Sequence, residues 1–212
     1  MYISLDNYRE IYLKGKSVDQ VLDQIEKIRH EISKTKAKLE SPANAGNRLA
    51  YPSESSVIDV YKGYLNTAME YVLLLGGEPC DLTEEEKTSQ IFDSTVDNIS
   101  CLTLTVGSYL QNKYELSFST DKAELCEIHL GSDEVKTEID FARAREKIRA
   151  LHIGEWKETY TPEQYGCTLN EPTKWQLRVD YSNGACSRFF DGFGIFPYNF
   201  HALAKLLKAD II

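Results

Sequence analysis

Histidines and cysteines are the residues of this chain whose side chains could bind a metal or act as a nucleophile. Neither type occurs at a spacing that predicts such a site, since the chain has no H-E-x-x-H and no C-x-x-C motif. A nucleophilic pair such as Cys167 with His152 could form only through the tertiary fold. A Gly-rich phosphate loop and a G-x-S-x-G motif are also missing from the sequence, so we expect no cofactor and no metal. The four histidines fall in four different predicted elements: His30, His129, His152 and His201.

The segment 152–165 and the aromatic residues near residue 195 are the remaining candidates for a binding site. Histidine, glutamate and tyrosine in that segment could supply acid and base groups if the fold brings them together in a pocket. Two phenylalanines follow glycines outside the clear strand pattern, and if exposed they would form an apolar patch of the kind that marks an interaction site. The candidate binding residues are His152, Glu155, Trp156, Tyr165, Phe193 and Phe196.

The charge of the chain is acidic and unevenly distributed. The 33 Asp and Glu outnumber the 24 Lys and Arg, which gives a net charge of −9. Residues 51–140 alone hold 18 acidic and 5 basic residues. A protein that binds a phosphate backbone needs a basic surface, so we expect no nucleic-acid partner. An acidic surface favours another protein, with basic character, as the partner.

Apolar runs and cysteine usage indicate where the protein resides. Residues 1–13 mix Asp6, Arg9 and Glu10 into their apolar side chains, so we expect no signal-peptide apolar region there. No run approaches the roughly 18 apolar residues of a membrane span, so we expect no membrane association. The five cysteines are odd in number and scattered, which indicates a reducing compartment. We therefore expect a cytoplasmic protein.

Apolar residues at a spacing of three and four predict two helices in the first third of the chain. The first runs from residue 18 to about residue 39, with Ser17 and Gln20 as a capping box. The second begins at Pro52 and ends before Gly76, and Leu22 of the first helix and Leu75 of the second are expected to belong to the apolar seams. A loop over 41–51 joins them, so residues 1–77 are expected to form an antiparallel helical hairpin. The two apolar seams either pack together or on the rest of the chain, or one of them forms a homodimer interface.

An alternation of period two replaces the helical spacing after an acidic segment, 78–92, which we interpret as a linker in which Thr83 could cap a short helix. Four short strands follow between 101 and 139, and in the third of them Cys126 and Ile128 are expected to face the core and His129 the solvent. A helix capped by Asp140, a strand hairpin around 175–190 in which Trp175 faces the core, and a last helix capped by Asn199 complete residues 93–212. The predicted class is α+β, with an antiparallel sheet of about six strands covered on one face by helices.

Several segments spread over nearly the whole chain occur together in one known family. They are 11–16, 39–42, 61–65 with 76–77, 151–156, 175 with 181–184, and 196–200. The combination resembles a family of small uncharacterised cytoplasmic proteins of gut Firmicutes, which are often encoded near mobile elements. The resemblance implies no assigned activity. The chain has Glu171 and Pro172 where the family tends to have Asp-Gly, and it has 108–112 where the family tends to have a glycine-rich turn. The glycines of the family at these two places therefore belong to no shared active site, unless this chain has lost the activity.

Three functional hypotheses follow. The leading one is a non-enzymatic protein-binding module of the immunity or counter-defence type, because the chain is acidic, shows no catalytic motif and offers a long helical surface. The alternative is an enzyme of unknown class whose site lies in the segment 152–165. The third is self-assembly through the helix seams.

Overall fold

The computed structural model describes residues 2–42, 54–107, 109–129, 131–170 and 172–209. The chain divides into two compact units, residues 1–82 and residues 83–212. Most of the loop predicted over 41–51 lies outside the described residues, as do Pro52, Ser108 and Glu171.

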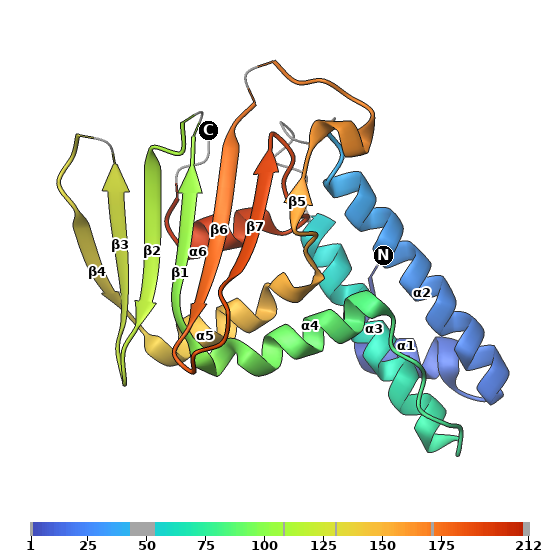
Figure 1. Cartoon of the computed structure of the whole chain (residues 1–212). Helices are drawn as coiled ribbons and strands as arrows, with labels where there is room; N and C mark the ends of the chain where they lie inside the picture. The colour runs from blue at the N-terminus through green and yellow to red at the C-terminus, as the bar shows by residue number, and fades with distance from the viewer. Residues whose placement is uncertain (1, 43–53, 108, 130, 171, 210–212) are drawn as a thin grey trace. The chain divides into compact units, whose positions relative to one another are not determined.

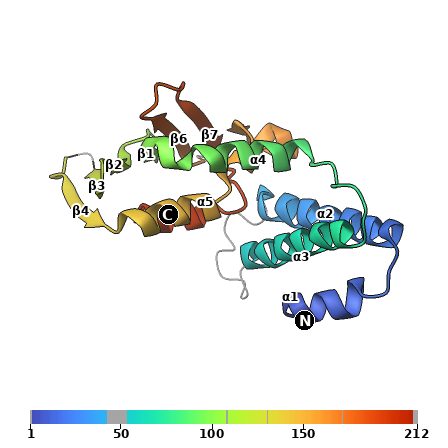
Figure 2. The ribbon, with the colours of Figure 1, turned by 90° about the horizontal axis from the view of Figure 1, so that it is seen from below.

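Helices make up the first unit (Figure 1). A short helix α1 (Leu5–Tyr8) continues into a π-helical turn (Arg9–Leu13), and α2 (Val18–Leu39) and α3 (Glu54–Leu74) follow. The predicted capping box is confirmed, because Ser17 accepts from the backbone N–H of Gln20 and the Gln20 side chain accepts from that of Ser17. A side chain added at Gly77 would lie 3.1 Å from Val18, so the end of α3 meets the start of α2. The predicted antiparallel hairpin is thereby confirmed (Figure 2).

The apolar seams of α2 and α3 are buried, and the N-terminal segment packs beside them. On α2 the buried apolar residues keep the predicted spacing: Val21, Ile25, Ile28 and Ile32. The hydroxyl of Tyr64 on α3 accepts from the Ile3 N–H at 2.9 Å and donates to the Ile3 carbonyl at 2.7 Å. The ring of Tyr8 stacks on that of Tyr64 with centroids 4.3 Å apart. These contacts hold α1 against α3.

The second unit consists of a sheet with helices (Figure 1). Its helices are α4 (Glu84–Thr95), α5 (Phe141–Ala150) and α6 (Phe200–Leu206). Its strands are β1 (Ile99–Val106), β2 (Asn112–Phe118), β3 (Ala123–His129), β4 (Val135–Ile139), β5 (Thr159–Tyr160), β6 (Lys174–Tyr181) and β7 (Arg188–Phe193). Of the segment 78–92, predicted as a linker, residues 84–92 lie in α4, and Thr83 caps that helix.

The strand order is β4-β3-β2-β1-β6-β7-β5, and every pair is antiparallel except β5 with β7. Because β5 has only two residues, the period-two pattern could not reveal it. The predicted α+β class with an antiparallel sheet and helices is confirmed, with seven strands in place of about six.

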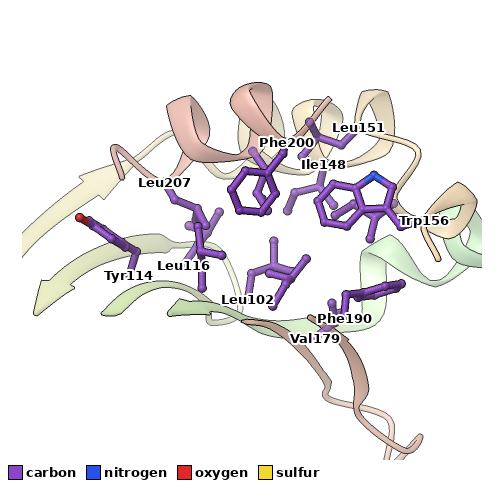
Figure 3. Packing of buried hydrophobic residues seen from close by; sticks show 14 of the residues in the cluster. Leu102, Tyr114, Leu116, Ile148, Leu151, Trp156, Val179, Phe190, Phe200 and Leu207 are labelled. Carbon is purple, nitrogen blue, oxygen red and sulfur yellow. The ribbon is translucent and has the colours of Figure 1, made fainter. Parts of the chain in front are cut away.

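Side chains of the sheet and of the helices meet in one core (Figure 3). Leu102 and Leu116 point from the strands toward Ile148 of α5 and Phe200 of α6 (Figure 3). Trp175 is also buried in this core, as the alternation in β6 predicts. α5 begins where Asp140 accepts from the N–H of Arg143, which confirms that cap.

The orientation predicted for β3 is wrong by one residue. Leu125 pairs with the core residue Leu116, whereas Cys126 pairs with Glu115 on the opposite face. His129 accordingly lies on the side of Tyr114, and their ring centroids are 5.6 Å apart. Two alternations compete in this strand, Ala123 with Leu125 and Cys126 with Ile128, and the pairing with β2 selects the first.

Candidate functional site

Trp156 is part of the hydrophobic core of the second unit. Its side chain is 5% exposed and contacts the rings of Trp175, Phe190 and Phe200. Its Nε1 donates to Oδ1 of Asn199 at 2.8 Å, and the Asn199 amide donates to the carbonyl of Leu151. The sequence predicts Asn199 as the cap of the last helix, and the residue occupies that position, but its side chain makes no capping bond. The Asn199 side chain instead accepts the hydrogen bond of the buried Trp156 indole.

The other aromatic candidates lie at the margin of the same core. Phe196 is half-buried and stacks on Trp175 with ring centroids 6.3 Å apart. Tyr165 packs against the core, and its hydroxyl accepts from Lys157 Nζ at 3.2 Å. Phe193 is half-buried with the Lys174 ammonium 5.6 Å from its ring centroid. The two phenylalanines therefore do not form the largely exposed patch that the sequence allows.

Glu155 and His152 face different neighbours, although three residues separate them. The Glu155 carboxylate accepts from the hydroxyl of Tyr198 at 2.9 Å. His152 follows α5 in the left-handed region, with φ +45°, at the position where a helix commonly ends in glycine. Its N–H donates to the carbonyl of Arg149, which closes the helix. The left-handed backbone turns the imidazole away from the segment that follows and toward α4.

α4 supplies the two side chains that contact this imidazole. Nδ1 of His152 lies 3.3 Å from Oδ2 of Asp93 and 3.4 Å from the hydroxyl of Ser89. His152 and Asp93 are about one third exposed, at 33% and 28%. The other Asp93 oxygen, Oδ1, is buried and has no hydrogen-bond partner among the described residues. Gly154 makes the close approach possible, because an added side chain there would lie 2.4 Å from the carbonyl of Thr88.

This His152–Asp93 pair has the geometry of an acid–base group. A carboxylate on Nδ1 fixes the tautomer and leaves Nε2 to exchange a proton with a ligand. Ser89 cannot be a nucleophile activated by this histidine, because its hydroxyl shares Nδ1 with the carboxylate. Sequence reasoning missed Asp93 and Ser89. The available signal was their i,i+4 spacing beside the buried Phe92, which places both on the inner side of a helix.

A second surface was also missed, at the end of the helical hairpin where α2 begins and α3 ends. Large apolar side chains stay exposed there, and we call them the hairpin-end leucines: Leu22 at 37%, Leu73 at 51%, Leu74 at 66% and Leu75 at 40%. Leu22 and Leu75 were expected to lie in the apolar seams, and their exposure shows that both expectations were wrong. The three consecutive leucines were the signal, because a seam of three-and-four spacing that passes through the buried Val72 can take at most one of them.

Carboxylates flank the hairpin-end leucines. Asp19 and Glu26 lie three and four residues from Leu22 along α2, Asp23 follows Leu22 directly, and all three are exposed; Glu26 forms an ion pair with Arg29. Glu70 lies at the same spacing from the leucines of α3 and is also exposed. An apolar centre with an acidic rim is therefore presented by this end of the hairpin.

Three findings concern metal binding, membrane crossing and relatives of the chain. The described residues contain no group of three or more His, Cys, Asp or Glu side chains that could hold a metal ion. None of the helices in the described part of the chain has both the length and the apolar character that a membrane crossing requires. Comparison of the chain with protein-family models, with curated proteins and with solved structures finds no match.

Proposed function

We propose that the chain is a non-enzymatic cytoplasmic module that binds another protein through the hairpin-end leucines. The observation that carries the proposal is the exposure of Leu73 and Leu74, which are 51% and 66% exposed at the end of a helix whose other apolar residues are largely buried. Large exposed apolar groups with a polar rim mark interaction surfaces. The role agrees with the use of Trp156, Glu155 and Asn199 in hydrogen bonds that hold the fold together.

The flanking carboxylates define the partner. A complementary surface presents an apolar centre with lysine or arginine around it, and charge attraction speeds the encounter. An acidic protein that covers a basic partner without altering it chemically suits an immunity or counter-defence role, as does the resemblance to proteins encoded near mobile elements. The structure joins none of the described cysteines in a disulfide, which is consistent with a reducing compartment.

Affinity capture with matched variants tests this proposal. The tagged protein, the double variant Leu73→Ser/Leu74→Ser and the control Ile91→Ser are incubated with lysate of the source cells. Ile91, which lies on α4, is 63% exposed, close to the 66% of Leu74. A saturable partner should bind the wild type and the control, be lost with the double variant, and be released as salt increases. A partner that binds all three proteins equally, or the absence of any saturable partner, would refute the proposal.

A second candidate function is acid–base catalysis by the His152–Asp93 pair. The buried Asp93 Oδ1 without a partner favours it, because such an atom is costly unless the fold or a ligand uses it. The imidazole would accept or donate a proton at Nε2 on a small substrate bound beside α4.

Turnover of activated esters and phosphoesters tests this second candidate. The wild type is compared with Asp93→Asn and with His152→Asn, because asparagine tolerates the left-handed backbone at residue 152. General acid–base groups contribute about 10²–10⁴-fold, so both variants should lose at least about a hundredfold of any measured rate. Equal rates in the three proteins would remove the candidate.

A further inference from the structure

Strand β4 forms an open edge of the sheet. β3 is its neighbour on one side, and no described strand pairs with the other side (Figure 1). Val135 at its start is 53% exposed. An edge strand presents unpaired N–H and C=O groups, which form a template for another strand.

The sequence of β4 is self-complementary about its central residue. Its five residues are Val135, Lys136, Thr137, Glu138 and Ile139. In an antiparallel pair with β4 of a second copy, centred on Thr137, Lys136 lies opposite Glu138 of the second copy, and Glu138 lies opposite Lys136. On the other face of the strand, Val135 meets Ile139. A shift by one residue would lose both the charge pairs and the apolar pairs.

The charges on β4 and β3 favour pairing of β4 with a second copy. Within its own sheet Glu138 lies opposite Glu124, a like charge, and it forms no ion pair with any described residue. Lys136 contacts Glu124 at 3.4 Å and Glu134 at 3.7 Å and remains 53% exposed. Among the described residues no cation pairs with Glu138, and a paired strand of a second copy would supply one.

We propose that two copies of the chain associate through β4, with a two-fold axis at Thr137 that joins the two sheets into one. The contact is isologous and closes after two copies. A five-residue strand buries less surface than a standard stable interface, so the dimer is weak and depends on concentration. This self-association goes beyond the proposed function and uses neither the hairpin-end leucines nor the His152–Asp93 pair.

Sedimentation of charge variants tests the pairing at millimolar protein concentration and at roughly 0.15 M salt, where charges more than about 8 Å apart are screened. Lys136→Glu and Glu138→Lys each place like charges opposite one another at both ends of the pair. Each single variant should weaken the dimer by about tenfold or more. The double variant Lys136→Glu/Glu138→Lys restores opposite charges in the same register and should return the affinity to within about threefold of the wild type.

The variant Lys27→Glu is the matched control, because it makes the same charge change at an exposed position on α2. Thermal unfolding of each variant at low concentration separates loss of pairing from loss of folding. A wild type that sediments as a monomer at every concentration would overturn the proposal. The proposal would also be overturned if neither single substitution changed the affinity of the dimer, or if the double variant dimerised as weakly as the single variants.

Discussion

Gly192 on β7 lies beneath the indole of Trp175, its neighbour on β6, and replacing it with alanine tests the packing of the core. An added Cβ would lie 2.3 Å from Nε1, 2.4 Å from Cε2 and 2.6 Å from Cζ2 of that indole. The indole ring is held in place, because its Nε1 donates to the Ile195 carbonyl at 2.7 Å. Phe196 stacks on it, and Trp156 contacts it edge to face.

Two effects contribute to the cost of Gly192→Ala. Overfilling a packed core costs about 1–3 kcal/mol, and three contacts below 3.0 Å place this site at the upper end. Displacing the indole also breaks its hydrogen bond and leaves a buried carbonyl unsatisfied, which adds about 1–3 kcal/mol. The free energy of unfolding of the second unit should therefore fall by about 3–5 kcal/mol.

Urea unfolding followed by far-UV circular dichroism measures this loss. Asp191→Ala, an exposed change at the preceding residue, is the control and should alter stability by less than about 0.5 kcal/mol. Trp175→Phe removes the indole atoms that the new methyl group would strike. The double variant Gly192→Ala/Trp175→Phe should therefore be more stable than the sum of the two single losses, by at least about 1 kcal/mol. Additive losses, or a Gly192→Ala protein as stable as the control, would refute this account of the packing.

Burial raises the pKa of Tyr8 to about 12. The protonated hydroxyl is favoured in the folded state, so the first unit should be stable below pH 10 and lose stability as the pH rises from about 10 to 12. Tyr8→Phe removes a buried hydroxyl that has no hydrogen-bond partner among the described residues, so its loss of stability over this range should be smaller in pH-dependent unfolding; the remaining loss comes from Tyr61, whose pKa burial also raises. Arg145 donates to two buried backbone carbonyls, so Arg145→Lys should lower the free energy of unfolding by about 2–4 kcal/mol in urea titrations. The control Arg143→Lys, at an exposed position of the same helix, should lower it by less than about 0.5 kcal/mol. Burial, with a hydrogen bond to a carboxylate, raises the pKa of the Cys126 thiol to about 11. At neutral pH a thiol reagent should therefore modify the exposed Cys186 at least about tenfold faster than Cys126, and equal rates would contradict the burial of Cys126.

The parts of the fold that the sequence predicts are those in which a local rule and the tertiary packing agree. The seam on α2 has one helical face that can be buried, and the capping box at Ser17 specifies where the helix begins. Trp175 alternates with polar neighbours, so the buried face of β6 was unambiguous. The outcome for β3 differs, because two alternations overlap in its sequence and only the partner strand decides between them.

The candidate site was harder to predict because its members meet through the fold. His152 was identified by its chemistry, but Asp93 lies 59 residues earlier, in a helix whose first turn is a run of glutamates that resembles a solvated segment. Trp156 was considered as a ligand-binding residue because aromatic side chains suit both roles, and its burial depends on contacts with β6, β7 and α6. The residue types were therefore predictable, and their neighbours were not.

The position of β1 in the middle of the sheet has a consequence for the order of folding during synthesis. β1 pairs with β2, which follows it directly, and with β6, which begins at Lys174 and leaves the ribosome much later. The core also contains Leu207, close to the end of α6. The helical hairpin can therefore fold while the chain is still growing, whereas the second unit must hold an incomplete sheet until almost all of its residues have emerged. During that interval one side of β1 has no partner, and this is the stage at which the nascent protein most needs a chaperone.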